Sequence, residues 1–312
     1  MRGLVGLTHS RTGFEFRGSI SMTQLKLPEA PLKSVAELID LREQLEQREA
    51  REPPSERWAY RGQPRDYGSL TPSFQRQFSQ RSSGTAQIIE ANLIAAFRKH
   101  YSKLDDRSAD MPLPDQIDTG HDLRCLSVMQ HYEIPTRLLD WTGNFWIALY
   151  FACSNDPGTD AELWFYEREL FAQQRASNPS LDAFMDTSPS PHEEPAFLSP
   201  ARNVMVGSDN NIVELDPRIS PRMRHQYAHH TVSTDVFSDH AALLRKLDAE
   251  SSSDGGKSPR VHRILVDGSC KGKTLQFLAD TMNTNAGTIF PDVVGLGRFL
   301  RWQFDSLRTM ML

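Results

Sequence analysis

The apolar residues of this chain recur at two spacings, one typical of helices and one typical of strands. After a capping box of Ser34 and Glu37 they repeat every three to four residues to about Ala50, which predicts an amphipathic helix. From Arg57 to Gln63 aromatic and polar residues alternate, which predicts a strand that ends at a turn. The same patterns predict further helices over residues 85–104, 120–131, 143–155, 238–249, 271–282 and 292–308, and further strands over residues 137–142, 161–167, 203–206, 212–215, 227–234 and 261–267.

These elements predict an α+β fold class, in a single mixed domain whose central strands are flanked by helices. The sequence shows no internal repeat that would indicate a solenoid or an array. We expect the helices over residues 85–104 and 120–131 to pack against each other. Residues 137–167 are expected to form a strand, a helix and a strand in succession.

Three segments lack the periodicity of framework elements. Residues 1–33 are predicted to be a flexible N-terminal tail, because their first part is polar and rich in glycine, arginine and serine. The start residue is either Met1 or Met22. Residues 172–201 are rich in serine, proline and acidic side chains, which indicates a mobile insertion. The domain is therefore predicted to span residues 34–312, with that insertion at 172–201 and a flexible loop at 250–259.

Composition sets limits on the class of protein. The 312 residues are 38% hydrophobic and 24% charged, which is enough to bury a full core. The net charge of −5 gives no overall attraction to nucleic acid or to anionic lipid. No apolar run approaches the roughly 20 residues that cross a bilayer, and the three cysteines lie far apart. We therefore expect a soluble cytoplasmic protein with no membrane partner and no structural metal.

The first candidate motif is Tyr60-Arg61-Gly62-Gln63. It places a permanently charged, bidentate hydrogen-bond donor at the end of a predicted strand, next to a glycine that lets the backbone approach a ligand closely. An arginine in this position suits a phosphate or a carboxylate. A structural ion pair is the more common explanation for an isolated match of this length.

The second candidate motif, residues 130–142, gathers amide, imidazole, guanidinium, carboxylate, indole and hydroxyl groups around a proline turn. Such a concentration of polar groups is typical of a ligand site. The structural alternative is that Arg137 and Asp140 form a buried pair, that Trp141 fills the core, and that the first two residues cap the preceding helix. Both interpretations remain open, and both can hold together.

Two further patterns are weaker. His225, His229 and His230 form a histidine cluster, but strand alternation directs the adjacent pair to opposite faces, and no carboxylate follows at ligand spacing. A metal site is therefore not expected. The Gly-Lys-Thr triplet that ends at Thr274 lacks the upstream glycine of a phosphate-binding loop, because Asp267 occupies that position.

The order and spacing of the two motifs resemble the FRG family. The Tyr-Arg-Gly-Gln segment is followed by Gln-His-Tyr-x-x-Pro-Thr-Arg-Leu-Leu-Asp-Trp-Thr and then by Ala-Leu-Tyr-Phe-Ala at residues 148–152. Weaker blocks at residues 218–226 and 289–296 agree with this resemblance. The chain departs from it after Gln226, where the family commonly has a glycine and then a phenylalanine and this sequence has Ala228 and His230.

The order of these elements is also similar to that of arginine–serine–glutamate ADP-ribosyltransferases. This resemblance implies that Arg61 holds a phosphate of NAD as substrate, that Thr142 orients the nicotinamide ribose, and that Gln226 or Glu214 supplies the third group. A neutral Gln226 could bond the ribose but could not stabilise an oxocarbenium ion. The implied catalytic residues are Arg61, Asp140, Thr142 and Gln226, and the implied cofactor-binding residues are Tyr60, Gly62, Gln63, Gln130, His131, Arg137 and Trp141.

Two functions from different classes follow. One is an NAD-using enzyme, an ADP-ribosyltransferase or NAD glycohydrolase acting on a nucleic acid or protein in bacterial defence or a toxin system. The other is a non-catalytic module that recognises a ligand or partner. A hydrolase that uses His131 and Asp140 as an acid–base pair is a third hypothesis, although the sequence offers no activated nucleophile.

Overall fold

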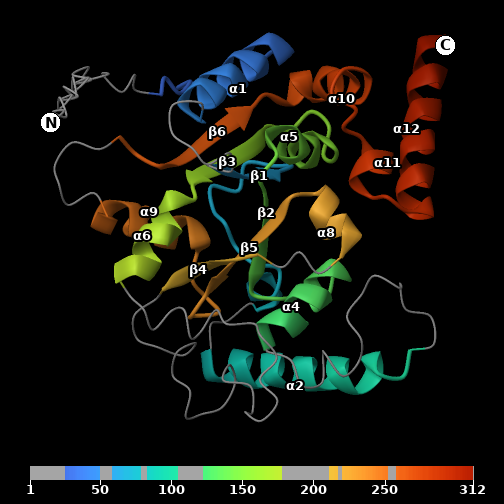
Figure 1. The fold of residues 1–312 in the computed structure, drawn as a ribbon. Helices are drawn as coiled ribbons and strands as arrows, with labels where there is room; N and C mark the ends of the chain where they lie inside the picture. Colours follow the sequence, from blue (N-terminus) through green and yellow to red (C-terminus); the bar gives the residue numbers. More distant parts are fainter. Residues whose placement is uncertain are drawn as a thin grey trace, which may run out of the picture.

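The computed structural model of the chain describes residues 25–49, 58–78, 83–104, 122–177, 211–216, 220–251 and 258–311. Its centre is a six-stranded antiparallel sheet, flanked by helices, which confirms the predicted α+β class (Figure 1). The strands are β1 (Trp58–Gln63), β2 (Leu138–Thr142), β3 (Ala161–Glu167), β4 (Ile212–Leu215), β5 (Ala228–Ser233) and β6 (Val261–Val266). The helices are α1 (Val35–Glu49), α2 (Ser83–Tyr101), α4 (Asp122–His131), α5 (Phe145–Cys153), α6 (Glu169–Ser177), α8 (Pro221–His225), α9 (His240–Ser251), α10 (Lys271–Asp280), α11 (Ala286–Ile289) and α12 (Val293–Met311).

The strand order of the sheet is β4-β5-β2-β1-β3-β6. β1 pairs with β3 along its whole length, whereas its described pairing with β2 is limited to Tyr60 and Thr142. The predicted strand–helix–strand succession β2-α5-β3 is present. Its two strands do not pair, because β1 lies between them and runs antiparallel to both. The sheet is therefore loosely joined between β1 and β2, next to the two sequence motifs.

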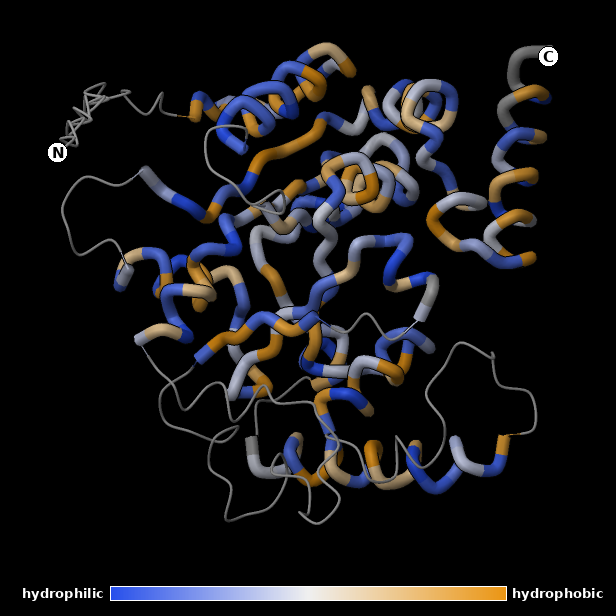
Figure 2. Tube along the Cα trace, viewed as in Figure 1, coloured by the Kyte–Doolittle hydropathy of each residue, from blue (hydrophilic) through white to orange (hydrophobic). Residues whose placement is uncertain are grey.

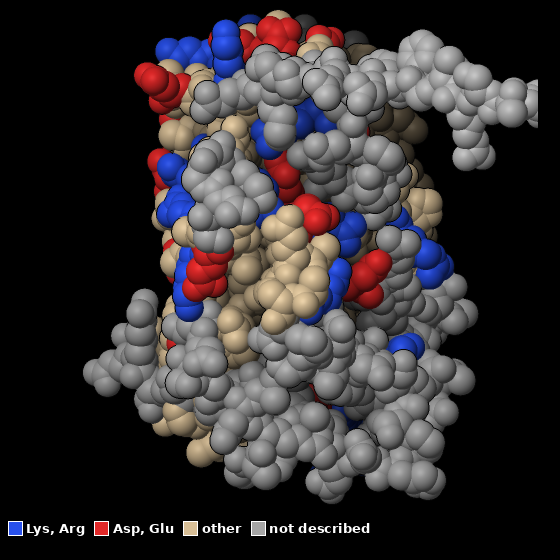
Figure 3. All heavy atoms as spheres, turned by 60° about the vertical axis from the view of Figure 1, so that its left-hand side comes forward, with Lys and Arg blue, Asp and Glu red and all other residues tan. Residues whose placement is uncertain are grey.

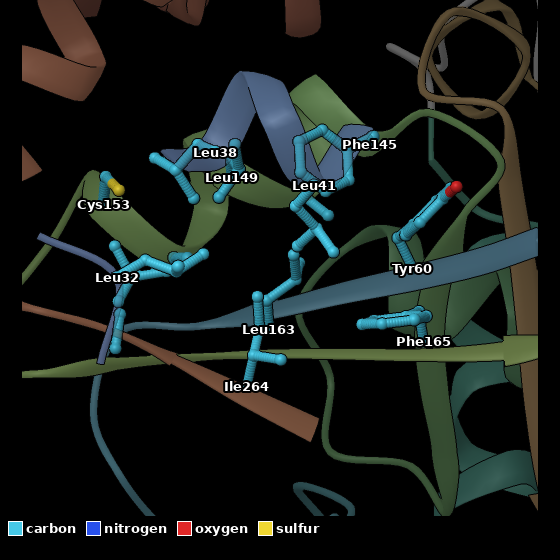
Figure 4. Packing of buried hydrophobic residues seen from close by; sticks show 14 of the residues in the cluster. Leu32, Leu38, Leu41, Tyr60, Phe145, Leu149, Cys153, Leu163, Phe165 and Ile264 are labelled. Atoms are coloured by element: carbon cyan, nitrogen blue, oxygen red, sulfur yellow. The ribbon is translucent and has the colours of Figure 1, made fainter. Parts of the chain in front are cut away.

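Three hydrophobic clusters attach the helices to the sheet. α1, α5 and α10 cover one face of β1, β3 and β6, where Leu41 and Leu149 pack toward Tyr60 and Leu163 (Figure 4). α6 and α9 contribute the apolar residues that meet Trp141, Trp164 and Tyr166. α2 and α4 pack together over β2, β4 and β5, which confirms the predicted contact between these two helices.

Gly62 allows α5 to lie directly on β1. A Cβ atom at this position would stand 1.9 Å from the carbonyl oxygen of Ala148 and 2.6 Å from the amide nitrogen of Ala152. The start of α5 is fixed, because the Asn144 side chain caps it by accepting hydrogen bonds from the amides of Trp146 and Ile147. The glycine of the first motif therefore serves helix packing, in addition to lining the cavity described below.

Parts of the predicted tail and insertion belong to the framework. Leu32 is buried, and its backbone bridges to Val266 of β6. Residues 172–177 continue α6, whose Leu170 and Phe171 are held in the core. The remaining predictions for the tail, the insertion, the strand at residues 203–206 and the loop at residues 252–257 lie outside the described residues.

The predicted C-terminal helix is preceded by the short helix α11 and extends to Met311. α12 projects beside α11 with apolar and polar residues alternating along it (Figure 2).

Within the described residues no helix combines the length and apolar character needed to span a bilayer. Among the described residues visible in Figure 3, acidic and basic side chains intermingle, without a broad area of one sign. Cys125, Cys153 and Cys270 are buried free thiols.

Candidate functional site

A cavity of about 290 Å³ opens where β1 and β2 separate, between these strands, α5 and α8. All the sequence-predicted site residues line this cavity except Gln63 and Arg137. Thus the two motifs do converge in space. The residues shared between prediction and cavity are Tyr60, Arg61, Gly62, Gln130, His131, Asp140, Trp141, Thr142 and Gln226.

Asp140 is the carboxylate of the cavity, and its side chain is 54% exposed. The amide of Gln130 donates to its Oδ2 at 2.9 Å, and Nε2 of His230 lies 3.2 Å from its Oδ1. Desolvation acts to raise the pKa of Asp140, but the bonds and charges of His230, Arg61 and Gln130 outweigh it and hold the pKa below its ordinary value. The carboxylate is therefore ionised at neutral pH.

Gln130 is oriented by the turn that precedes β2. The hydroxyl of Thr136 donates to Oε1 of Gln130 at 2.6 Å and accepts from the amide of Leu138 at 3.1 Å. These bonds fix which end of the Gln130 amide faces Asp140, so the NH₂ group points to the carboxylate. The proline turn of the second motif thus positions the polar groups of the cavity.

Arg61 lies just beyond the position at which β1 and β2 pair. Its Nη1 donates to the backbone carbonyl of Asp140 at 2.7 Å. Its buried Nε has no hydrogen-bond partner among the described residues, and Arg61 makes no ion pair with any carboxylate they contain. Burial lowers the pKa of Arg61, an effect that Asp140 opposes, but a guanidinium keeps its charge in proteins. The structural ion pair considered for Arg61 is therefore not formed within the described part of the chain.

Thr142 and Gln226 are engaged with each other and with the backbone. The Thr142 hydroxyl donates to the Gln226 carbonyl at 2.6 Å and accepts from the Asn144 amide at 3.1 Å. The Gln226 side chain donates to the carbonyl of Ile289 at 3.3 Å. These bonds join the ends of β2, α8 and α11 around the cavity, so both residues shape its wall in this structure.

Arg137 and Gln63 lie away from the cavity and hold the framework. Arg137 forms a buried bidentate pair with Glu90 of α2, and both side chains are only 1% exposed. The carboxylate partner of Arg137 is therefore Glu90, whereas the structural alternative had paired Arg137 with Asp140. Gln63 donates to the buried carboxylate of Glu162 at 2.7 Å.

Trp141 and Glu214 are also structural groups. Trp141 touches the cavity, but its indole is buried and donates to the Thr231 hydroxyl at 2.9 Å. Glu214 accepts from the Tyr166 hydroxyl at 2.7 Å and pairs with Arg168. Glu214 does not line the cavity, so the alternative that made it the third group of the site was wrong in placing it there.

Among the cavity residues that sequence reasoning did not select are two ionisable side chains, Arg222 and His230. The sequence predicted that strand alternation separates the adjacent histidines. It did not predict the register that sets His230 opposite Asp140. His230 and Ala228, the two positions that depart from the FRG pattern, both line the cavity. Arg222 was present in a motif block but not selected. It makes no hydrogen bond or ion pair through its side chain to the described residues.

His131 is a further titratable side chain of the cavity. Burial, reinforced by the positive charge of Arg222, lowers its pKa to about 4. The imidazole is therefore neutral at neutral pH. Although His131 and Asp140 share the cavity, the described hydrogen bonds of Asp140 go to His230 and Gln130, so an Asp140–His131 pair is not formed. No group of three or more histidine, cysteine, aspartate or glutamate side chains suited to a metal ion occurs in the described residues.

Taken together, an antiparallel α+β domain presents one small cavity that contains two arginines without carboxylate partners and an ionised aspartate. This arrangement is suited chemically to a polar, anionic ligand. Residues 56–161 match the family model of the FRG domain, so the chain contains an FRG domain. Searches of curated proteins and of solved structures found no match. The matched segment holds both sequence motifs, while Arg222, Gln226 and His230 lie outside it.

Proposed function

We propose that this FRG-domain protein uses NAD and cleaves the bond between nicotinamide and ribose. The observation that carries this proposal is the placement of Arg61, Arg222 and the ionised Asp140 around one cavity. Two cations without carboxylate partners suit the diphosphate of a dinucleotide. A carboxylate beside them suits the positive charge that develops on the ribose when nicotinamide leaves.

The reaction requires few protein groups. The bond between C1′ of the ribose and the nicotinamide nitrogen breaks, and its electron pair stays with the ring as neutral nicotinamide leaves. Asp140 stabilises the resulting oxocarbenium ion, which is then attacked by an oxygen of water or of a target nucleic acid or protein. The proton from that oxygen passes to solvent, so water yields ADP-ribose, nicotinamide and one proton.

Asp140 is the better candidate for the third group than Gln226. A glutamine can bond the ribose but cannot neutralise an oxocarbenium ion, and the Gln226 side chain already donates to Ile289. Asp140 carries the required charge and is exposed to the cavity. His230 and Gln130 act as positioning residues, because each holds one oxygen of this carboxylate.

We also propose a role in bacterial defence or a toxin system, with a nucleic acid or protein as acceptor. The support is the resemblance to FRG proteins, several of which occur beside defence or toxin-like modules.

The test is nicotinamide release from NAD by the purified full chain, with and without cell extract. Asp140→Asn keeps the size and one hydrogen-bonding oxygen of the side chain, so it should bind NAD and lose release by about 100-fold or more. An exposed carboxylate away from the cavity, Glu43→Gln on α1, is the matched control and should leave release unchanged. NAD binding without release in the unmodified protein would reject the enzymatic proposal, and absence of binding would reject the use of NAD altogether.

The second candidate function is a non-catalytic recognition module. It is favoured by Thr142, a residue that is only 5% exposed and whose hydroxyl is already hydrogen-bonded to Gln226 and Asn144. A catalytic hydroxyl that orients a ribose would have to exchange one of these bonds. This candidate predicts saturable binding of an anionic ligand with no product, and the release assay combined with calorimetric titration separates it from the enzyme.

A further inference from the structure

A second cavity of about 520 Å³ lies directly beside the first. The two share Phe151, Asn155 and Arg222, which form their common boundary. The second cavity is built by α5, α10, α11 and α12, and Figure 1 shows α11 and α12 standing together at one side of the domain. Cavities for small ligands commonly measure about 300–1,000 Å³, and the second cavity falls within that range.

Aromatic side chains from three elements line this second cavity. α5 contributes Tyr150 and Phe151, and Phe290 follows α11. α12 contributes Phe299 and Trp302, whose rings lie nearly parallel, with an interplanar angle of 20° and centroids 6.2 Å apart. Flat aromatic surfaces at the wall of a cavity bind a nucleobase by stacking, because every base presents a π face.

Two arginines stand at the Phe290 ring. The guanidinium carbon of Arg222 is 4.5 Å from the ring centroid, and that of Arg298 is 5.2 Å away. Neither guanidinium forms an ion pair with a carboxylate of the described residues. Burial lowers the pKa of Arg222, although a guanidinium stays charged. The boundary between the two cavities therefore carries two guanidinium groups without ion-pair partners, which suit phosphate oxygens. The Glu133 carboxylate also lines the second cavity, and its charge acts on Arg222 without an ion pair.

We propose that the aromatic cavity binds the purine base of an adenosine diphosphate group, with Arg222 and Arg298 on its phosphates. This inference rests on the proposed use of NAD. The first cavity then receives the nicotinamide ribose beside Asp140, and the two cavities form one dinucleotide site. The aromatic rings account for the base, Arg222 and Arg298 together with Arg61 of the first cavity for the diphosphate, and the aspartate for the reacting ribose.

α12 supplies a matched pair of phenylalanines for the test. Phe299 lines the cavity, whereas Phe304 is 62% exposed and does not line it. Helical spacing of about 100° per residue places the two side chains on opposite sides of α12. Removing either ring changes the same helix by the same chemistry. Phe299 also packs against the cluster of Ile289 and Phe290, so the fold of each variant is checked by circular dichroism before the affinities are compared.

Calorimetry on the full chain would measure the dissociation constants of ADP, nicotinamide mononucleotide and NAD. Phe299→Ala should weaken ADP roughly 5- to 100-fold, which is the range of one base–aromatic stack, and leave nicotinamide mononucleotide within about twofold. Phe304→Ala should leave all three unchanged. Trp302→Leu keeps apolar volume on α12 and should weaken ADP as well, which gives a second variant if Phe299→Ala fails to fold.

The outcomes separate this inference from the proposed function. If nicotinamide mononucleotide and NAD bind while ADP does not, or if ADP binds equally to the Phe299 and Phe304 variants, the purine site is wrong and the proposed use of NAD stands. If ADP binds through Phe299 and nicotinamide mononucleotide does not bind, the purine site stands and the NAD reaction is wrong. Failure of all three ligands overturns both.

Discussion

Asp140 on β2 and His230 on β5 face each other as register partners, and Nε2 of His230 lies 3.2 Å from Oδ1 of Asp140. Nδ1 of the same imidazole lies 3.3 Å from the Ser127 hydroxyl of α4. Since that hydroxyl donates to the Leu123 carbonyl, α4 fixes the ring and the ring fixes the carboxylate. The orientation of the proposed catalytic carboxylate is therefore set by two neighbouring elements.

His230→Phe should raise the pKa of Asp140 toward its ordinary value. The histidine supplies both a hydrogen bond and a charge that lower this pKa, and phenylalanine keeps a ring of similar size. A carboxylate with a depressed pKa is ionised above that pKa and loses its charge as the pH falls through it. The acid limb of nicotinamide release should therefore move to higher pH in the variant, which a pH–rate profile measures. An unchanged acid limb would show that His230 does not tune Asp140.

Arg61→Gln should weaken NAD binding about 10- to 100-fold, because a charge-assisted hydrogen bond to phosphate contributes about 1.5–3 kcal/mol. Arg65→Gln is the matched control, since Arg65 follows on the same segment and its side chain is 56% exposed. Titration calorimetry at fixed salt measures both variants. Equal affinities in the two would mean that Arg61 does not contact the ligand.

Arg137→Met should destabilise the fold by about 3–5 kcal/mol, because it leaves the Glu90 carboxylate buried without its partner. Urea unfolding measures the loss. Combining it with Glu90→Leu removes both charges and should restore most of the stability, since replacing a buried pair by apolar groups is often neutral. Full stability in the single variant would show that the Arg137–Glu90 pair does not support the fold.

The elements near the site were predictable because their signals are local. The capping box at Ser34, the alternation around Tyr60 and the apolar spacing of α2 and α4 depend on neighbours in the chain, and each predicted its element. The separation of His229 and His230 onto opposite faces likewise follows from strand geometry.

The partners of the site residues were not predictable, because they depend on contacts between distant segments. Arg137 lies three residues from Asp140 in the sequence, yet its carboxylate partner is Glu90 on another helix. Arg222 becomes a cavity residue only when α8 packs beside β5. A local motif identifies which residues are unusual, and the fold decides which of them meet.

Gly62→Ala should cost about 1–3 kcal/mol or more, because a Cβ atom would overlap the Ala148 carbonyl at 1.9 Å. The blocking atom belongs to the backbone of α5, so this helix would have to move away from β1, which would enlarge the cavity. Gly84→Ala on α2 is the matched control, since a Cβ there meets nothing within 4 Å. Denaturant unfolding of both variants measures the difference. Equal stabilities would show that α5 accommodates the methyl group.

Buried histidines should make the protein less stable in mild acid. Burial, reinforced by the charge of Arg48, lowers the pKa of His262 to about 4. The unfolded chain takes up a proton below a pKa of about 6.5, while the folded chain resists it until about pH 4. The unfolded state therefore binds more protons in this window, and the free energy of unfolding falls as the pH is lowered through it. One such group contributes at most about 1.4 kcal/mol per pH unit.

His262→Phe should remove this contribution and preserve the packing. The imidazole centroid lies 4.9 Å from that of Phe165 and 5.9 Å from that of Trp58, and a phenyl ring can occupy the same layer. Urea unfolding from pH 7.5 to 4.5 should therefore show a shallower loss of stability in the variant below pH 6.5 and parallel curves above pH 7, which serve as the internal control. Parallel curves over the whole range would mean that His262 takes up its proton equally in the folded and unfolded chain.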